Sequence, residues 1–210
     1  MVGCPDMDMD GWADVVDDCP DLAGNSTANG TNACPDQDGD GWADAQDAFV
    51  NEPTQWLDTD GDGFGDAING ATPDACPTVH GTSTVDRYGC PDPDADGRSS
   101  PDDGWGLDDG ADAFPTDPAQ WSDFDGDGLG DNHNDPDWTD RNPSWPGEYL
   151  AIVDDYDRCP SLAGTSTMLD VLGCPDADGD GYANHLDAFQ NEATQWADSD
   201  GDGFGDNPAG

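Results

Sequence analysis

Apolar residues are few and scattered along this chain, in which 33% of the residues are hydrophobic. The longest apolar stretch runs from Tyr149 to Val153, and the segment 148–153 predicts a short strand because it alternates and contains β-branched residues. No apolar run approaches the roughly 18 residues that a membrane-spanning helix needs. We therefore expect too little apolar material for a conventional core in a chain of 210 residues.

The polar positions carry the stronger pattern. Asp-x-Asp-x-Asp-Gly occurs seven times: six copies begin at Asp6, Asp36, Asp58, Asp123, Asp176 and Asp198, and the seventh, at Asp92, is interrupted after its glycine. Ca²⁺ prefers six to eight hard oxygen ligands, which a loop supplies when carboxylates alternate with spacers and a glycine permits a sharp turn. Each run therefore predicts a calcium loop with ligands at positions 1, 3, 5, 7, 9 and 12, of which position 7 contributes its backbone carbonyl.

Three copies fill every ligand position of this frame. They are Asp6, Asp8, Asp10, Trp12, Asp14 and Asp17; Asp36, Asp38, Asp40, Trp42, Asp44 and Asp47; and Asp176, Asp178, Asp180, Tyr182, Asn184 and Asp187. Two copies are predicted to close on asparagine: Asp58, Asp60, Asp62, Phe64, Asp66 and Asn69; and Asp123, Asp125, Asp127, Leu129, Asp131 and Asn134.

The two remaining copies are irregular. In the interrupted copy, the candidate ligands are Asp92, Asp94, Asp96, Asp103 and Asp112. The last copy supplies Asp198, Asp200, Asp202, Phe204 and Asp206 and reaches Gly210 before position 12 is clearly supplied.

The formal charge of −45 makes cations a requirement for folding. Of 49 acidic residues 46 are aspartate, and they face only four arginines and no lysine. Unpaired charges about 4 Å apart repel by roughly 1 kcal/mol in water and by several times that near a protein surface. We expect the metal-free chain to be expanded or unfolded and the folded chain to bind about ten or more Ca²⁺ ions, some shared with carboxylates outside the frames, such as Asp74. The same charge argues against nucleic acids and anionic membranes as partners.

The seven cysteines alternate between two contexts, and each precedes a proline. Cys19, Cys76 and Cys159 follow calcium loops, whereas Cys4, Cys34, Cys90 and Cys174 precede them. Equal spacing and similar intervening residues predict the pairs Cys19–Cys34, Cys76–Cys90 and Cys159–Cys174, each worth about 3 kcal/mol in the chain-entropy model. Zinc sites would require closely spaced cysteines, which this chain lacks. Disulfides indicate an extracellular location, secreted or at a cell surface.

The unpaired Cys4 predicts a partner cysteine upstream in a longer chain or in a neighbouring molecule. We therefore expect head-to-tail continuation or self-association into a fibre.

A linker with Ala-Phe at its start and Gln-Trp at its end joins successive loops three times, ending at Trp56, Trp121 and Trp196. The chain accordingly divides into four predicted repeats. These are a short one-loop repeat at 1–33, a two-loop repeat at 34–89, a two-loop repeat at 90–173 with insertions at 98–102 and 132–155, and a partial two-loop repeat at 174–210. We expect the aromatic residues at position 7 to pack on the linker side chains.

The run from Asp6 to Pro20 closely resembles the thrombospondin type 3 repeat, and the stretches 60–66 and 200–206 are similar to it. The resemblance covers nearly the whole chain apart from the insertions, and the Ala-Phe/Gln-Trp linker looks like that of microbial variants. It implies an irregular, elongated array with little regular secondary structure, wound around a row of calcium ions and stapled by disulfides. EF-hand or dockerin modules share the loop but need flanking amphipathic helices, for which these short, proline-containing linkers leave no room.

These features predict an extracellular structural protein that forms a stiff, calcium-loaded rod, stalk or fibre segment. One alternative is an adhesion module whose Trp-rich insertion at 132–155 binds a glycan or receptor, although that insertion also has the simpler interpretation of a local cap. Another is a calcium buffer or mineral nucleator. No catalytic constellation is visible, so we expect no enzyme. Asn25 and Asn29 begin N-glycosylation sequons and are candidate glycosylation sites.

Overall fold

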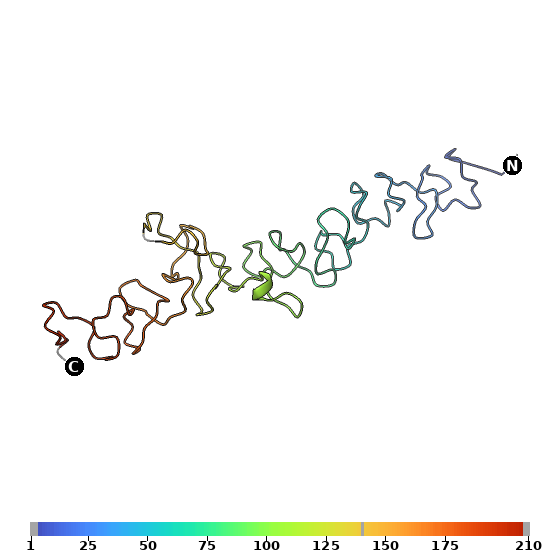
Figure 1. Cartoon of the computed structure of the whole chain (residues 1–210). Helices are drawn as coiled ribbons and strands as arrows, with labels where there is room; N and C mark the ends of the chain where they lie inside the picture. Colours follow the sequence, from blue (N-terminus) through green and yellow to red (C-terminus); the bar gives the residue numbers. More distant parts are fainter. Residues whose placement is uncertain (1–3, 140, 208–210) are drawn as a thin grey trace. The chain divides into compact units, whose positions relative to one another are not determined.

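The structure is a computed structural model that describes residues 4–139 and 141–207. Its one regular element in those residues is the 3₁₀ helix η1, Leu107–Asp109, and the rest of the described chain follows turns and bends (Figure 1). Three isolated β-bridges complete the list of regular pairings: Gly65 with Pro73, Asp102 with Trp105, and His133 with Tyr149. The expectation of little regular secondary structure is confirmed.

Aspartate side chains replace the usual backbone ladders as hydrogen-bond partners. In the loop that begins at Asp36, the Asp36 carboxylate accepts hydrogen bonds from the backbone N–H groups of Gly39 at 2.7 Å and Gly41 at 3.0 Å. Both glycines have positive φ, at 81° and 103°, a region that residues with a Cβ seldom adopt. The backbone therefore curls around the carboxylates and cannot continue as a helix or strand.

The buried apolar residues are small. They are Ala33, Cys34, Ala43, Cys90, Ala111, Ala119, Val153, Cys174 and Ala183. Large apolar side chains lie outside, with Ile68 80% and Phe204 77% exposed. Much of the remaining buried material is polar, including Asp157 and Gln55. The interior is thus a series of small hydrogen-bonded clusters, as the scattered apolar residues predicted.

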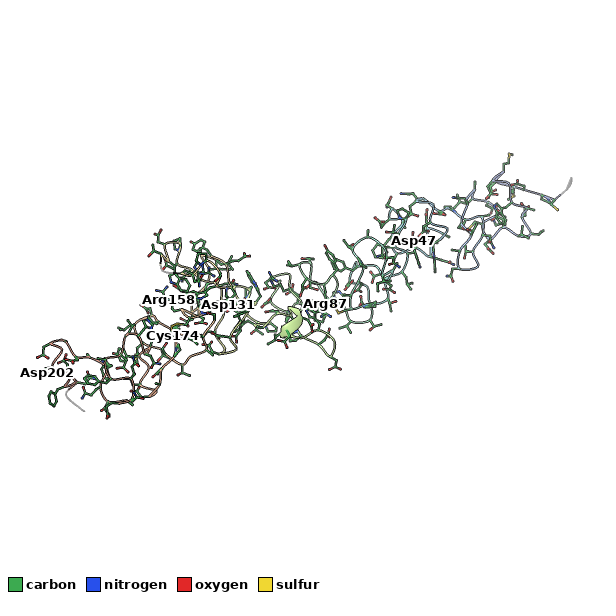
Figure 2. All side chains as sticks on the ribbon, in the orientation of Figure 1. Asp47, Arg87, Asp131, Arg158, Cys174 and Asp202 are labelled. Atoms are coloured by element: carbon green, nitrogen blue, oxygen red, sulfur yellow. A yellow bond between two sulfur atoms is a disulfide. The ribbon has the colours of Figure 1, made fainter. Side chains whose placement is uncertain are left out.

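The three predicted disulfides are confirmed. Cys19–Cys34, Cys76–Cys90 and Cys159–Cys174 are bonded, with Cα–Cα distances of 5.1, 5.1 and 5.0 Å. Cys174 is labelled in Figure 2. Cys4 is exposed and forms no disulfide, and its predicted partner elsewhere stays a prediction.

Each disulfide loop is shaped by a glycine and a serine. A Cβ at Gly24 would lie 1.9 Å from the carbonyl carbon of Cys34, so only glycine fits there. Ser26 is fully buried, donates to the Thr31 carbonyl at 3.1 Å and accepts from the Cys34 N–H at 3.0 Å. The same pair of residues recurs in the other two loops, as Gly81 with Ser83 and Gly164 with Ser166.

The chain forms two compact units, Met1–Asp92 and Pro93–Gly210. The four predicted repeats are finer than this division and stay a prediction; the outermost residues of the first and last, 1–3 and 208–210, lie outside the described residues. Within the described part of the chain, no helix is long and apolar enough to cross a membrane.

The predicted strand at 148–153 is wrong. Only a single bridge forms there, in which the His133 N–H donates to Glu148 and the Leu150 N–H donates to His133. The chain then turns back through a hydrogen bond from the Val153 N–H to the Leu150 carbonyl at 3.2 Å. Val153 points inward and is 3% exposed, so its burial in the turn prevails over local β-propensity.

Candidate metal-binding loops

The described residues contain seven groups of at least three histidine, cysteine, aspartate or glutamate side chains whose potential ligand atoms all lie within 4.8 Å of one another. Five of them occupy positions 1, 3 and 5 of the predicted loops at Asp6, Asp36, Asp58, Asp92 and Asp123. Such a cluster of carboxylates is repulsive by itself, and a divalent cation at its centre would reverse that repulsion. These groups could hold metal ions.

Hydrogen bonds within each loop orient the carboxylates. The Trp42 N–H donates to Asp40 at 2.7 Å, and the Gln37 N–H donates to Asp44 at 2.8 Å. The other uninterrupted loops repeat these bonds, for example at Tyr182 and Asp180, 2.9 Å apart. One oxygen of each of these carboxylates is therefore held by the backbone, which fixes the direction of the second.

Several second oxygens are buried without a hydrogen-bond partner. Among the described residues, this holds for Oδ2 of Asp8, Asp38, Asp40, Asp178 and Asp180 and for both carboxylate oxygens of Asp60. A buried oxygen without a partner costs about 1–3 kcal/mol, and more when it is charged. Recurrence at positions 3 and 5 makes these atoms candidate ligands, and an all-oxygen donor set fits a hard cation such as Ca²⁺.

Six aspartates form a second recurring class, which closes the loops. Each accepts, through Oδ1, the backbone N–H two residues later at 2.7–2.8 Å: Asp17, Asp47, Asp74, Asp112, Asp157 and Asp187. Oδ2 of Asp74, Asp157 and Asp187 is buried without a hydrogen-bond partner. Asp17, Asp47 and Asp187 occupy position 12 of their contiguous frames. The shared geometry favours the same role for Asp74, Asp112 and Asp157.

In the loop at Asp58, this closing position falls on Asp74 instead of the predicted Asn69. Asn69 is exposed, whereas Asp74 is 6% exposed and its N–H donates to the carbonyl of Gly65, the residue at position 8, at 2.8 Å. The intervening residues form a turn that leaves the frame and returns to it. The shared Asp-x-Cys sequence of Asp17 and Asp74 is the signal that identifies this residue.

The loop at Asp123 closes in the same way on Asp157 instead of Asn134. The Asp157 N–H donates to Gly130, again at position 8, at 2.9 Å. Asp157 is fully buried, while Asn134 is exposed and donates from its side chain to the Val153 carbonyl at 2.8 Å. The predicted insertion at 132–155 therefore lies between ligand positions of a single loop.

The interrupted loop keeps more of its frame than the sequence suggested. Arg98 occupies position 7, with its N–H donating to Asp96 at 2.7 Å, and the fully buried Ser99 occupies position 8. The Asp112 N–H then donates to the Ser99 carbonyl at 3.0 Å, so Asp112 closes the loop. Asp103 is exposed. The additional residues therefore begin after Ser99, two residues from the predicted start at 98.

Burial raises the pKa of the closing aspartates in the metal-free fold. Burial, with a smaller contribution from neighbouring carboxylates, raises the pKa of Asp157 to about 8 and that of Asp74 to about 6. Burial also raises the pKa of Asp131, at position 9, to about 6. Charged carboxylates are thus unfavourable here without a cation, as expected for metal ligands in a metal-free structure.

The linker glutamines have a structural role that the sequence analysis did not assign. Gln120 is 3% exposed; its Oε1 accepts the Asn132 N–H at 3.0 Å, and its Nε2 donates to the Asn132 and Asp155 carbonyls at 3.0 and 3.2 Å. Gln55 makes equivalent bonds to Ala67 and Ala71. Each glutamine therefore clamps backbone that lies between position 9 and the closing aspartate of its loop. The recurrence of glutamine directly before the linker tryptophan was the sequence signal that could have predicted this role.

The predicted packing of position-7 aromatic residues on the linkers holds in part. Trp42 stacks on Trp56 and Tyr182 on Trp196, with ring centroids 6.2 and 4.8 Å apart. In the interrupted loop the Arg98 guanidinium lies 4.6 Å from the Trp121 ring centroid and takes the place of the aromatic ring. Phe64 instead packs on Tyr88. Trp12 and Phe204 are exposed.

The insertion at 132–155 gathers aromatic and cationic side chains into one cluster within the second unit. Trp138 lies 5.2 Å from His133, 5.8 Å from Trp145 and 5.5 Å from Tyr156, measured between ring centroids. The guanidinium of Arg158 lies 4.8 Å from the Trp138 ring centroid (Figure 2 labels Arg158). The rings contact each other and their own chain, which agrees with the interpretation as a local cap.

The candidate glycosylation residues Asn25 and Asn29 are both exposed on the first disulfide loop. Their modification stays a prediction.

A scan against protein-family models gives no match for this chain, and a search of curated proteins also gives no match. The geometry of the loops therefore carries the functional argument.

Proposed function

We propose that this chain is an extracellular structural protein in which tandem Asp-rich loops bind Ca²⁺ and thereby stiffen the chain into a rod, stalk or fibre segment. The loops would form an array of the thrombospondin type 3 kind. The observation that carries the proposal is the recurrence of buried carboxylate oxygens without hydrogen-bond partners at positions 3, 5 and 12. A chain of charge −45 with a core of alanines and half-cystines needs such a cation to hold those oxygens together.

In each loop the residues at positions 1, 3, 5, 9 and 12 would supply carboxylate oxygens and position 7 its carbonyl. The bound cation supplies positive charge where an ordinary domain has a hydrophobic core. Extracellular calcium modules bind with Kd of about 10⁻⁴ to 10⁻³ M, and a site at ten times its Kd stabilises the fold by about 1.4 kcal/mol. Summed over the seven predicted loops, this is comparable to the total stability of a small domain.

Two other features support an extracellular role. Three disulfides require an oxidising compartment to persist, and millimolar calcium in such compartments would saturate sites of this affinity. The proposal includes no catalytic activity, because the clustered carboxylates belong to the loop frames.

The test is small-angle scattering combined with calorimetric calcium titration. The calcium-loaded chain should scatter as a stiff rod and bind about ten or more ions, and excess EDTA should convert it to an expanded coil. The same scattering profile with and without EDTA would contradict the proposal. Stoichiometric calcium binding without any change in scattering would instead favour a calcium buffer. Negative-stain imaging would distinguish single rods from fibres.

A further inference from the structure

A groove beside the first disulfide is wide, whereas the equivalent groove in the second unit is smaller and is lined in part by two tryptophans. The first groove has a volume of about 540 Å³ and is lined by residues that include Asp18, Cys19, Thr31, Cys34 and Ala45. The second has a volume of about 200 Å³ and is lined by Arg158, Cys159, Val171, Cys174 and His185, together with Trp138 and Trp145. We call them the Cys19–Cys34 groove and the Cys159–Cys174 groove.

The two grooves are the same place in two copies of one repeat. Five of the residues that line the first groove have counterparts 140 positions later that line the second. The backbone bonds agree: the Asp18 N–H donates to Asn32 at 3.1 Å, and the Arg158 N–H donates to Leu172 at 3.0 Å. The two residues without a counterpart, Trp138 and Trp145, come from the insertion.

The chain therefore contains its own example of what fits this groove. In the second unit the occupant is a short segment that presents two indole rings 5.8 Å apart. Arg141 of the same segment lies 5.7 Å from the Trp138 ring centroid and donates to the carbonyls of Trp145 and Gly147. The first unit contains no such insertion beside its groove, and Leu22 on the groove wall is 59% exposed.

The lining of the Cys19–Cys34 groove has the opposite charge. Asp18 stands where the second groove has Arg158, and Ala45 stands where it has His185. Arg158 places its guanidinium 4.8 Å from the Trp138 ring, and this cation is absent from the first groove. An indole that enters the first groove would thus meet a carboxylate, which favours a ligand that brings its own cation.

We propose that the Cys19–Cys34 groove is a docking site for a segment of another polypeptide that presents a tryptophan with an adjacent arginine or lysine. The indole would fill the cavity beside the disulfide, and the basic side chain would pair with Asp18. Tryptophan and arginine are the residues that most often dominate the energy of protein interfaces. The strongly negative chain would also attract a basic segment from a distance.

The test uses the full chain in saturating calcium and a fluorescently labelled peptide with the sequence of residues 136–147, in which Trp138, Arg141 and Trp145 are kept and both aspartates are changed to asparagine so that the peptide is basic. Fluorescence anisotropy should show saturable binding. Ala45→Trp, a change at an exposed position on the groove, should weaken binding at least about tenfold, since it fills the cavity. Asp18→Arg should also weaken binding. A peptide with both tryptophans changed to alanine should not bind.

Ile68→Trp is the matched control, because Ile68 is 80% exposed and does not line the groove. This variant should bind the peptide as the parent chain does. The proposal is overturned if no saturable binding occurs up to millimolar peptide, or if Ala45→Trp, with an unchanged circular dichroism spectrum, binds equally well. Dimerisation of the chain alone that Ala45→Trp abolishes would also overturn it, because the occupant would then be a second copy.

Discussion

The loop at Asp36 and the loop at Asp123 reach the same geometry by different routes. The first closes on Asp47 within one contiguous frame, while the second closes on Asp157 after an insertion that adds aromatic residues. In both, the closing carboxylate accepts the backbone N–H two residues later at 2.7 Å. The comparison indicates that an Asp-rich loop of this kind tolerates long excursions before its closing aspartate, provided the backbone returns to the residue at position 8.

The difference lies in burial. Asp47 is half-buried, whereas Asp157 is fully buried. Burial raises the pKa of both carboxylates, and for Asp157 it raises the pKa to about 8. We therefore expect the split loop to depend on its cation more strongly than the contiguous loop does.

Calcium removal should have the largest effect. It tests whether both loops need a bound cation to stay folded. The chain has no lysine and four arginines, so trypsin reports on Arg87, Arg98, Arg141 and Arg158 alone. We expect protection in calcium and rapid cleavage at all four in EDTA, measured by mass spectrometry of the fragments over time. Continued protection of Arg141 and Arg158 in EDTA would mean that the aromatic insertion holds the split loop without a cation.

Removal of one closing carboxylate should affect the two loops differently. Asp157→Asn and Asp47→Asn each remove one charged ligand and should weaken calcium binding at their own site about tenfold or more. Asp157→Asn should also stabilise the metal-free fold at neutral pH, because it removes a carboxyl group that burial forces to take up a proton on folding. Calorimetric calcium titration measures the first effect and urea unfolding in EDTA the second.

Asp21→Asn, at an exposed aspartate outside the frames, is the control and should leave calcium binding unchanged. Equal calcium affinity in Asp157→Asn and the parent chain would show that Asp157 is not a ligand.

The pH dependence should follow the raised pKa values. In the metal-free fold burial raises the pKa of Asp157 to about 8 and that of Asp74 to about 6, from the ordinary aspartate value of 3.8. Protonation of these groups therefore stabilises the metal-free fold below about pH 4, and this contribution is lost as pH rises through 6 and then 8. Calcium binding requires the ionised form and should strengthen over the same range.

Calcium titrations between pH 5 and 8.5, followed by site-resolved NMR, measure this effect. The Asp157 site should release calcium at a higher pH than the Asp74 site as the solution is acidified. Release of calcium from both sites at the same pH would contradict the difference between the pKa values of Asp157 and Asp74.

Loss of a linker glutamine should have the smallest effect. Gln120→Leu leaves the buried N–H of Asn132 and the carbonyl of Asp155 without their partner, which should cost about 1–3 kcal/mol. Gln55→Leu should cost a similar amount in the first unit. Thermal unfolding in calcium measures both changes against Gln37→Leu, at an exposed glutamine. No shift in either clamp variant would show that water replaces the clamp.

Much of this arrangement could be read from residue types and spacing. The disulfide pairs followed from alternating contexts, and the lack of regular structure followed from scattered apolar residues. The ligand frame was predictable where it is contiguous, as at Asp36, because a fixed spacing in sequence then equals a fixed position in space. It was not predictable at Asn69 and Asn134, where counting along the chain passes into residues that leave the loop.

The sequence by itself determined which cysteines pair, where acidic side chains cluster, and that the buried apolar residues would be few, since these depend on local spacing, charge and composition. Only the tertiary structure decided that Asp74 and Asp157 close their loops and that Gln55 and Gln120 clamp the backbone. It also decided that two tryptophans narrow the Cys159–Cys174 groove, whereas the Cys19–Cys34 groove stays wide. Those outcomes depend on where the chain returns after an insertion. The return is set by backbone hydrogen bonds and burial, which spacing along the sequence does not encode.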